Sequence, residues 1–141
     1  MKSLPVFAFI VLGPVAIAAE PGVVFVDRTK PVDICGLHAD TLDHIDEALV
    51  EKGGVREAAG DQKFLAYESL DFSHIWTFTR LGHPAHPAVI CRALKGGESG
   101  LEVTMDFLCA GDRVACETLY GEFTALNASM KAAAAKKKPS P

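Results

Sequence analysis

Residues 88–109, AVICRALKGGESGLEVTMDFLC, decide the fold. Two apolar runs, Ala88–Leu94 and Leu101–Cys109, flank a glycine-rich segment, which is typical of a β-hairpin. Setting Lys95 opposite Leu101 brings six apolar residues onto one face of the hairpin. These residues form the pairs Val89 with Phe107, Cys91 with Met105 and Ala93 with Val103. A shift by one residue would set apolar against polar side chains, so the sequence predicts this register and a core position for the first cysteine of the hairpin.

Further strand-like runs lie upstream of the hairpin. Phe64–Leu70 and Ser73–Arg80 are rich in aromatic and β-branched residues, as strands are. The short apolar run Val23–Val26 is a candidate for an edge strand. Arg28–Cys35, which contains a proline, is predicted as a loop, and residues 54–62 as a loop or a short helical turn.

Two helices are predicted around these strands. Asp40–Lys52 has an apolar stripe at helical spacing, Asp40 as its N-cap and a glycine pair after its last residue. The second helix follows Asp112, its N-cap, and runs to about Met130. The pattern therefore predicts an α+β fold, in which a small antiparallel sheet of three to four strands carries two helices packed on one face.

The four cysteines predict two disulfides, because an even count of cysteines in a small domain of an oxidising compartment is typical of a disulfide framework. In the expected register Cys109 lies opposite Pro87, about 13 Å along the sheet from Cys91 and beyond disulfide reach. Cys109 with Cys116 would pin the corner between the last strand and the last helix. The favoured pairing is therefore Cys35–Cys91 with Cys109–Cys116, and Cys35–Cys109 with Cys91–Cys116 is the alternative.

The first residues have the pattern of a secretory signal peptide. Lys2 supplies a positive charge, Leu4–Leu12 is an apolar run, and Ala16-Ile17-Ala18 offers the small residues of a cleavage site. The sequence predicts a signal peptide over residues 1–18 and a single α+β domain over residues 19–130. An uncleaved anchor is the alternative, but the apolar stretch is shorter than the roughly 20 residues of a spanning helix. No transmembrane segment is expected after cleavage, and the expected location is periplasmic or secreted.

Charge is unevenly distributed along the chain. Residues 20–130 carry 18 acidic against 9 basic side chains, whereas lysines gather at the C-terminus. A body this acidic argues against nucleic acid as a partner. Residues 131–141, KAAAAKKKPSP, are of low complexity and are predicted to form a disordered basic tail, with an electrostatic contact to an anionic envelope surface as the alternative.

The loop Gly82–Pro87 contains two His-Pro pairs. A proline after each histidine favours an extended, polyproline-like backbone, in which His83 and His86 project from the same side about 9 Å apart. They are the candidate ligands for copper or zinc, if a bend or a third ligand completes the site. Otherwise no cofactor is expected, and the alternative for this segment is a rigid connector before the hairpin.

Other candidate residues indicate binding more than catalysis. His74 shares a strand face with Trp76, and the two are the candidate binding residues. No phosphate loop, dinucleotide fingerprint or catalytic constellation is present in the sequence, so no catalytic residue is predicted and an enzyme is the less favoured alternative.

Three segments together carry a resemblance to known sequences: Trp76-Thr77-Phe78-Thr79, His83–Val89, and the late pair Cys109 and Cys116. Residues 74–127 resemble small uncharacterised exported proteins of Gram-negative bacteria, which implies a periplasmic location and no particular activity. We therefore expect a non-catalytic binding or interaction module, acting on an envelope protein or a small ligand. The alternatives are a periplasmic metal-binding protein that uses the His-Pro loop and a small secreted hydrolase.

Overall fold

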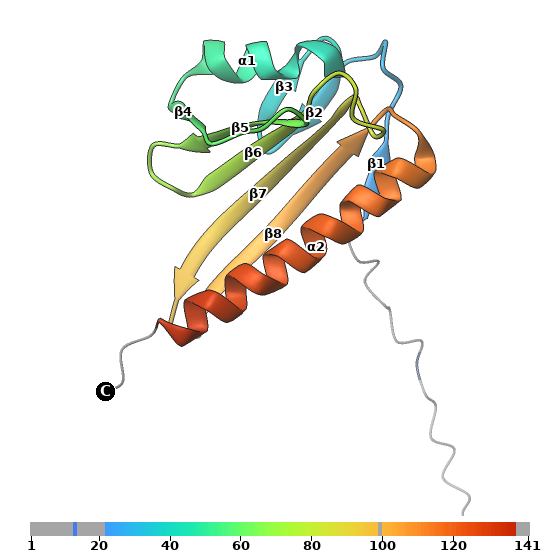
Figure 1. The fold of residues 1–141 in the computed structure, drawn as a ribbon. Coiled ribbons are helices and arrows are strands. Elements are labelled where there is room, and N and C mark those ends of the chain that lie inside the picture. The colour runs from blue at the N-terminus through green and yellow to red at the C-terminus, as the bar shows by residue number, and fades with distance from the viewer. Residues whose placement is uncertain (1–12, 14–21, 99, 138–141) are drawn as a thin grey trace, which may run out of the picture.

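A six-stranded mixed sheet organises the protein, in the order β1-β8-β7-β6-β5-β4. The computed structural model describes residues 13, 22–98 and 100–137 (Figure 1). The sheet is larger than the expected three to four strands, and it is not purely antiparallel, because β1 pairs with β8 in parallel. Its strands are β1 (Val23–Phe25), β4 (Val55–Ala58), β5 (Phe64–Ser69), β6 (His74–Thr79), β7 (Ala88–Gly97) and β8 (Gly100–Cys109).

Two of the strands lie where loops were predicted. β4 falls within residues 54–62, where Gly53 and Gly54, both with positive φ, turn the chain from a helix back along β5. β2 (Val32–Ile34) falls within Arg28–Cys35 and pairs with β3 (Leu37–Ala39) as a separate two-stranded hairpin. Both are only three or four residues long, too short for alternation alone to indicate a strand.

The two helices cover opposite faces of the sheet, which corrects the expectation that they share one. Figure 1 shows α2 (Arg113–Lys136) along one side of β7 and β8, and α1 (Ile45–Lys52) with β2 and β3 on the other. Side chains of α1, β2 and β3 pack with Trp76, Phe78, Val89, Cys91 and Leu108, and we call this side the α1 face. Side chains of α2 pack with Ala88, Ile90, Phe107 and Cys109, which define the α2 face.

Burial on both faces also explains why the predicted hairpin register is wrong. In the structure Ile90 pairs with Phe107 and Cys91 with Asp106, one residue away from the expected pairing. Residues 88–92 are buried on both sides, so neither set of alternating side chains marks a solvent face. The observed register instead sets Lys95 opposite Glu102, a favourable pair of opposite charges near the turn. Cys91 is fully buried, as expected.

Two disulfides tie the layers to the sheet. Cys35, in the turn between β2 and β3, is joined to Cys91 on the α1 face, with 6.5 Å between their Cα atoms. Cys109 is joined to Cys116 of α2 on the opposite face, with 6.2 Å between Cα atoms. This is the pairing that the sequence favoured, although the register used to argue for it was shifted. Cys91 and Cys109 belong to opposite faces, which separates them more decisively than distance along the sheet.

The helix ends differ from the sequence prediction. Asp112 caps α2 as expected, accepting a hydrogen bond from the Ala115 amide at 3.0 Å. The helix continues to Lys136, so the start of the predicted tail is helical. α1 begins without Asp40, because a short 3-10 turn (Leu42–His44) precedes it. The predicted signal peptide, except Gly13, and the last four residues lie outside the described part of the chain.

In the described residues, no helix is long and apolar enough to cross a membrane. The two disulfides are typical of proteins from oxidising compartments, and they fit the extracellular or periplasmic location that the sequence predicts.

Candidate functional site

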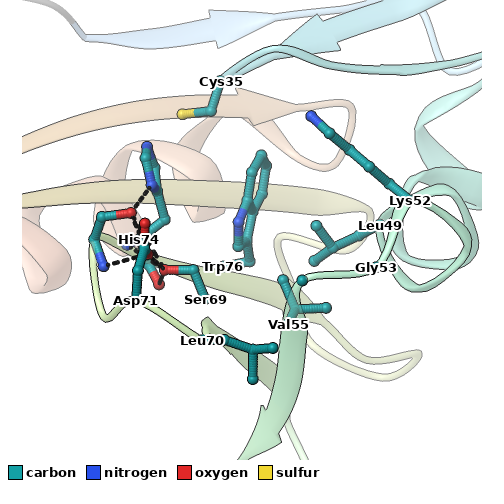
Figure 2. A pocket seen from close by; sticks show the side chains of 12 residues that line it. Cys35, Leu49, Lys52, Gly53, Val55, Ser69, Leu70, Asp71, His74 and Trp76 are labelled. Atoms are coloured by element: carbon teal, nitrogen blue, oxygen red, sulfur yellow. Dashed lines mark hydrogen bonds between the residues drawn. The ribbon is translucent and has the colours of Figure 1, made fainter.

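A pocket of about 430 Å³ opens on the α1 face, between the end of α1, the start of β4 and the turn that joins β5 to β6 (Figure 2). We call it the Trp76 pocket. The side chains that give it its chemistry are Cys35, Lys52, Leu70, Asp71, His74 and Trp76. Both candidate binding residues of the sequence analysis, His74 and Trp76, therefore line one pocket.

His74 and Trp76 form the aromatic wall of the pocket. They lie two residues apart on β6, so both side chains project from the α1 face. Their rings stack with 6.5 Å between centroids and 24° between planes. Trp76 is only 5 % exposed, because the hydrophobic cluster beneath α1 and the Cys35–Cys91 bridge surround it, whereas His74 is half-buried. The wall is thus rigid on its inner side and accessible at the imidazole.

Asp71 anchors a hydrogen-bond network behind this wall. One of its carboxylate oxygens accepts hydrogen bonds from the Ser73 hydroxyl at 2.6 Å, the Ser69 hydroxyl at 2.8 Å and the Ser73 amide at 3.0 Å. These bonds, with that of the Ser73 hydroxyl foremost, lower the pKa of Asp71 from 3.8 to about 2. The aspartate is therefore ionised at neutral pH, and it holds the turn in a single geometry.

The network also orients His74. The Ser73 oxygen lies 2.7 Å from Nδ1 of His74, and the Ser73 proton is directed to the Asp71 carboxylate. The serine oxygen must then accept a hydrogen bond from Nδ1, which leaves Nε2 of the neutral ring as an acceptor. A second bond, from the His74 amide to the Ser69 hydroxyl at 2.9 Å, fixes the backbone of the same residue. The imidazole is therefore held in one orientation, with Nε2 available to accept a hydrogen bond from a ligand.

The same bonds do not form a hydrolytic triad. In a Ser-His-Asp triad, histidine takes the serine proton and aspartate orients the histidine. Here the aspartate bonds to the serine, and the histidine donates to it. Ser73 is adjacent in sequence to His74 and lies in a hairpin turn, so the cluster is an ordered Asx-type turn.

Charged and apolar groups form the rim of the pocket. Lys52 lies opposite Asp71 and donates a hydrogen bond to the carbonyl oxygen of Gly36 at 3.3 Å. Leu70, which lines the pocket, is 60 % exposed, and Phe72, which does not line it but follows Asp71 in the same turn, is 59 % exposed. The guanidinium of Arg56 lies over the Phe72 ring at 4.7 Å from its centroid. The rim therefore offers one charge of each sign beside exposed apolar surface.

The His-Pro loop is anchored at both histidines, which point to different places. His83 lines a pocket beside α2 and accepts a hydrogen bond from the Ala85 amide at 3.0 Å. Burial, followed by the charge of Lys63, lowers the pKa of His83 below its ordinary value. His86 lines a different pocket, together with Leu42 of the other layer, and its Nδ1 lies 2.9 Å from the carbonyl oxygen of Thr79.

The structure therefore does not bring His83 and His86 together as a ligand pair. In the described residues, no group of three or more histidine, cysteine, aspartate or glutamate side chains is placed to hold a metal ion. Gly111 packs so closely on the backbone of Ala85 and His86 that a Cβ atom there would overlap it. These contacts fix the backbone of the loop before β7, and both the metal site and the rigid connector stay predictions.

Sequence reasoning missed the residues that organise the Trp76 pocket. An aspartate followed two positions later by a serine, between two strand-like runs, is the pattern of an Asx turn and could have identified Asp71. Lys52 and Cys35 come from other elements, and only the fold places them beside it.

None of the family models, curated proteins or solved structures compared with the chain matches it. The resemblance of residues 74–127 to exported proteins of Gram-negative bacteria therefore stays a prediction.

Proposed function

We propose that the protein is an exported, non-catalytic binding module that holds a polypeptide segment of an envelope partner in the Trp76 pocket. The observation that carries this proposal is the Asp71 network, which fixes His74 against Trp76 with an acceptor nitrogen available. Preorganised side chains lower the entropic cost of binding, because they are already ordered before the partner arrives.

The rim supports a polypeptide partner. Exposed apolar side chains such as Leu70 and Phe72 are common where proteins bind one another, since water is released when they are covered. The pocket, of about 430 Å³, has room for one apolar side chain, and both Trp76 and Leu70 line it. We therefore expect the partner segment to place one apolar side chain in the pocket, with polar residues before and after it in its sequence.

Charge indicates which neighbours these are. Acidic residues outnumber basic ones by two to one over residues 20–130, so basic partners are attracted and acidic ones repelled. At the rim the negative charge of Asp71 faces the positive charge of Lys52, so the preference comes from the net charge of the body. We therefore expect the apolar anchor of the partner to be flanked by lysine or arginine.

Intrinsic fluorescence tests this proposal, because Trp76 is the chain's single tryptophan. The probe is a capped lysine–leucine–lysine peptide, compared with capped glutamate–leucine–glutamate and lysine–serine–lysine peptides. We expect a saturable change with the first peptide alone, and mass spectrometry should recover it intact. Cleavage of the peptide would favour the hydrolase alternative, and no change with any peptide at millimolar concentration would exclude this mode of binding.

A matched pair of variants locates the binding site. Asp71→Asn removes the charge that organises the Trp76 pocket, and we expect about tenfold weaker binding of the first peptide. Asp61→Asn changes an aspartate of the same kind, which accepts hydrogen bonds from the Lys63 and Phe64 amides at the turn between β4 and β5. It lies away from the pocket and should leave binding unchanged. Equal losses in both variants would place binding elsewhere.

A further inference from the structure

Arg92 of β7 is a buried arginine on the α2 face of the sheet. It is 6 % exposed and projects toward α2, where its direct contacts are with the uncharged side chains of Phe123, Asn127 and Met130. In the described residues, no carboxylate forms a salt bridge with it. Burying a charge without a partner is strongly unfavourable, so its position requires an explanation.

The contacts that Arg92 does make are weak. Nη1 lies 3.5 Å from the amide oxygen of Asn127 and 3.2 Å from the sulfur of Met130. The guanidinium lies over the Phe123 ring, 5.2 Å from its centroid. Nε is buried and has no hydrogen-bond partner. An arginine has five N–H donors, and a thioether and a distant amide satisfy few of them.

Arg28 provides a comparison, because it forms a complete salt bridge with a carboxylate of the same chain. Its Nε and Nη2 donate to the two carboxylate oxygens of Asp43 at 2.7 and 2.9 Å, a bidentate pair at the surface. Arg92 is far more buried than Arg28, and its need for an anion is correspondingly greater. The fold itself does not supply that anion within the described residues.

A groove leads to Arg92 beside α2. Its inner part is a pocket of about 380 Å³, lined by Phe64, Ala66, Thr77, Arg92, Phe123 and Leu126. A second pocket of about 440 Å³ adjoins it, because Phe64 and Glu122 line both. The second pocket continues along α2 over Val114, Ala115 and Leu119. We call the two together the Arg92 groove: Arg92 lies at its inner end, and the apolar wall along α2 is flanked in the outer pocket by Lys63 and Asp112.

We propose that the Arg92 groove binds an alkyl carboxylate, a fatty-acid anion, with the carboxylate at Arg92 and the chain over Phe64 along α2. The carboxylate supplies the acceptor oxygens that the guanidinium lacks, and the chain covers the apolar wall. The exposed carboxylates of Asp61 and Glu122 also line the inner pocket, so a ligand with several negative charges is repelled. This site lies on the opposite face from the Trp76 pocket and does not depend on the function proposed there.

Octanoate and its uncharged analogue octanamide test the charge at the head of the ligand. In the unaltered protein, octanoate should shift the side-chain N–H resonance of Arg92 in NMR spectra and saturate, whereas octanamide should bind about 10- to 100-fold more weakly. Arg92→Met keeps the length of the side chain and removes the charge, and should reduce octanoate affinity by a similar factor. Equal affinity for octanoate and octanamide would overturn the proposal, even if Arg92→Met failed to fold.

The apolar part of the groove has its own test. Butyrate should bind more weakly than octanoate, by up to about fourfold for each missing CH₂ group. Val114 lies about 13 Å along α2 from Phe123, within reach of dodecanoate but not of octanoate. Val114→Glu places a negative charge in the outer pocket and should weaken dodecanoate while leaving butyrate unchanged. Val50→Glu makes the same change at an exposed valine of α1, on the other face, and should affect neither ligand. If Val114→Glu and Val50→Glu behave alike, or if chain length has no effect, the chain does not lie along α2.

Discussion

The two faces of the sheet differ in how completely their charged side chains are hydrogen-bonded. On the α1 face, Asp71 receives three hydrogen bonds and in turn orients His74. On the α2 face, Arg92 is more deeply buried, yet its partners are a distant amide oxygen, a thioether and an aromatic ring. A satisfied network indicates a site organised in advance, whereas an unsatisfied buried charge indicates that a ligand completes it.

The two disulfides give the largest expected difference between the faces. Cys35–Cys91 closes a separation of 56 residues and Cys109–Cys116 one of 7. Loop-closure entropy predicts a loss of about 4 kcal/mol when the first is replaced by two alanines and about 2.5 kcal/mol for the second. Urea denaturation followed by Trp76 fluorescence measures both. Equal losses of unfolding free energy in the two variants would show that loop-closure entropy does not determine how much each disulfide stabilises the fold.

The helix caps differ in the opposite direction and on a smaller scale, because the stronger cap belongs to α2. Asp112→Ala removes the hydrogen bond to the Ala115 amide at the start of α2 and should cost about 1 kcal/mol. Thr41→Ala alters the start of the 3-10 turn before α1, where the side chain makes no capping bond, and should cost under about 0.5 kcal/mol. Chemical denaturation followed by circular dichroism compares them, with Asp112→Ser as the variant that keeps a cap. A larger loss for Thr41→Ala would contradict this order.

Asp71 should show the effect of hydrogen bonding in its titration. Its carboxyl carbon is expected to titrate by NMR near pH 2, because the Ser73 and Ser69 hydroxyls stabilise the charged form. The contribution of Asp71 to stability is then present above the ordinary carboxyl pKa and is lost as the pH falls toward 2. Ser73→Ala should move the titration back toward 3.8. A midpoint near 4 in the unaltered protein would show that the network is not formed.

His83 should show a smaller effect with a different cause. Burial beside α2 favours its neutral ring, so its pKa should lie below 6.5. The unfolded chain then binds a proton at a higher pH than the folded one, and stability falls as the pH drops below 6.5. Imidazole NMR titration measures the midpoint, and His83→Gln should remove this part of the pH dependence. A midpoint above 6.5 would contradict burial as the governing cause.

Much of the architecture was predictable from local patterns. The central strands, the helix that follows Asp112 and the glycine-rich hairpin all have signals that lie within a few residues of one another. The hairpin register was not predictable in this way. The alternation rule assumes that one face of a strand is exposed to solvent, whereas residues 88–92 are buried on both faces. The same assumption placed the two helices on one face.

The candidate sites were less predictable than the fold. His74 and Trp76 were found because two alternate residues of one strand share a face. His83 and His86 were expected on the same side, yet each is bonded into a separate corner of the fold, to Ala85 and Thr79 respectively. An aromatic pair depends on strand geometry alone, whereas a ligand pair in a loop depends on the contacts of every neighbouring element.

The connectivity of the two disulfides has a consequence for how the chain matures. Each bridge joins cysteines that are consecutive in the sequence, Cys35 with Cys91 and Cys109 with Cys116. A chain that enters an oxidising compartment N-terminus first exposes Cys91 as the earliest partner for Cys35, before either of the later cysteines has arrived. Oxidation in order of arrival then produces both native bridges directly, without the reshuffling through mixed disulfides that interleaved pairings require.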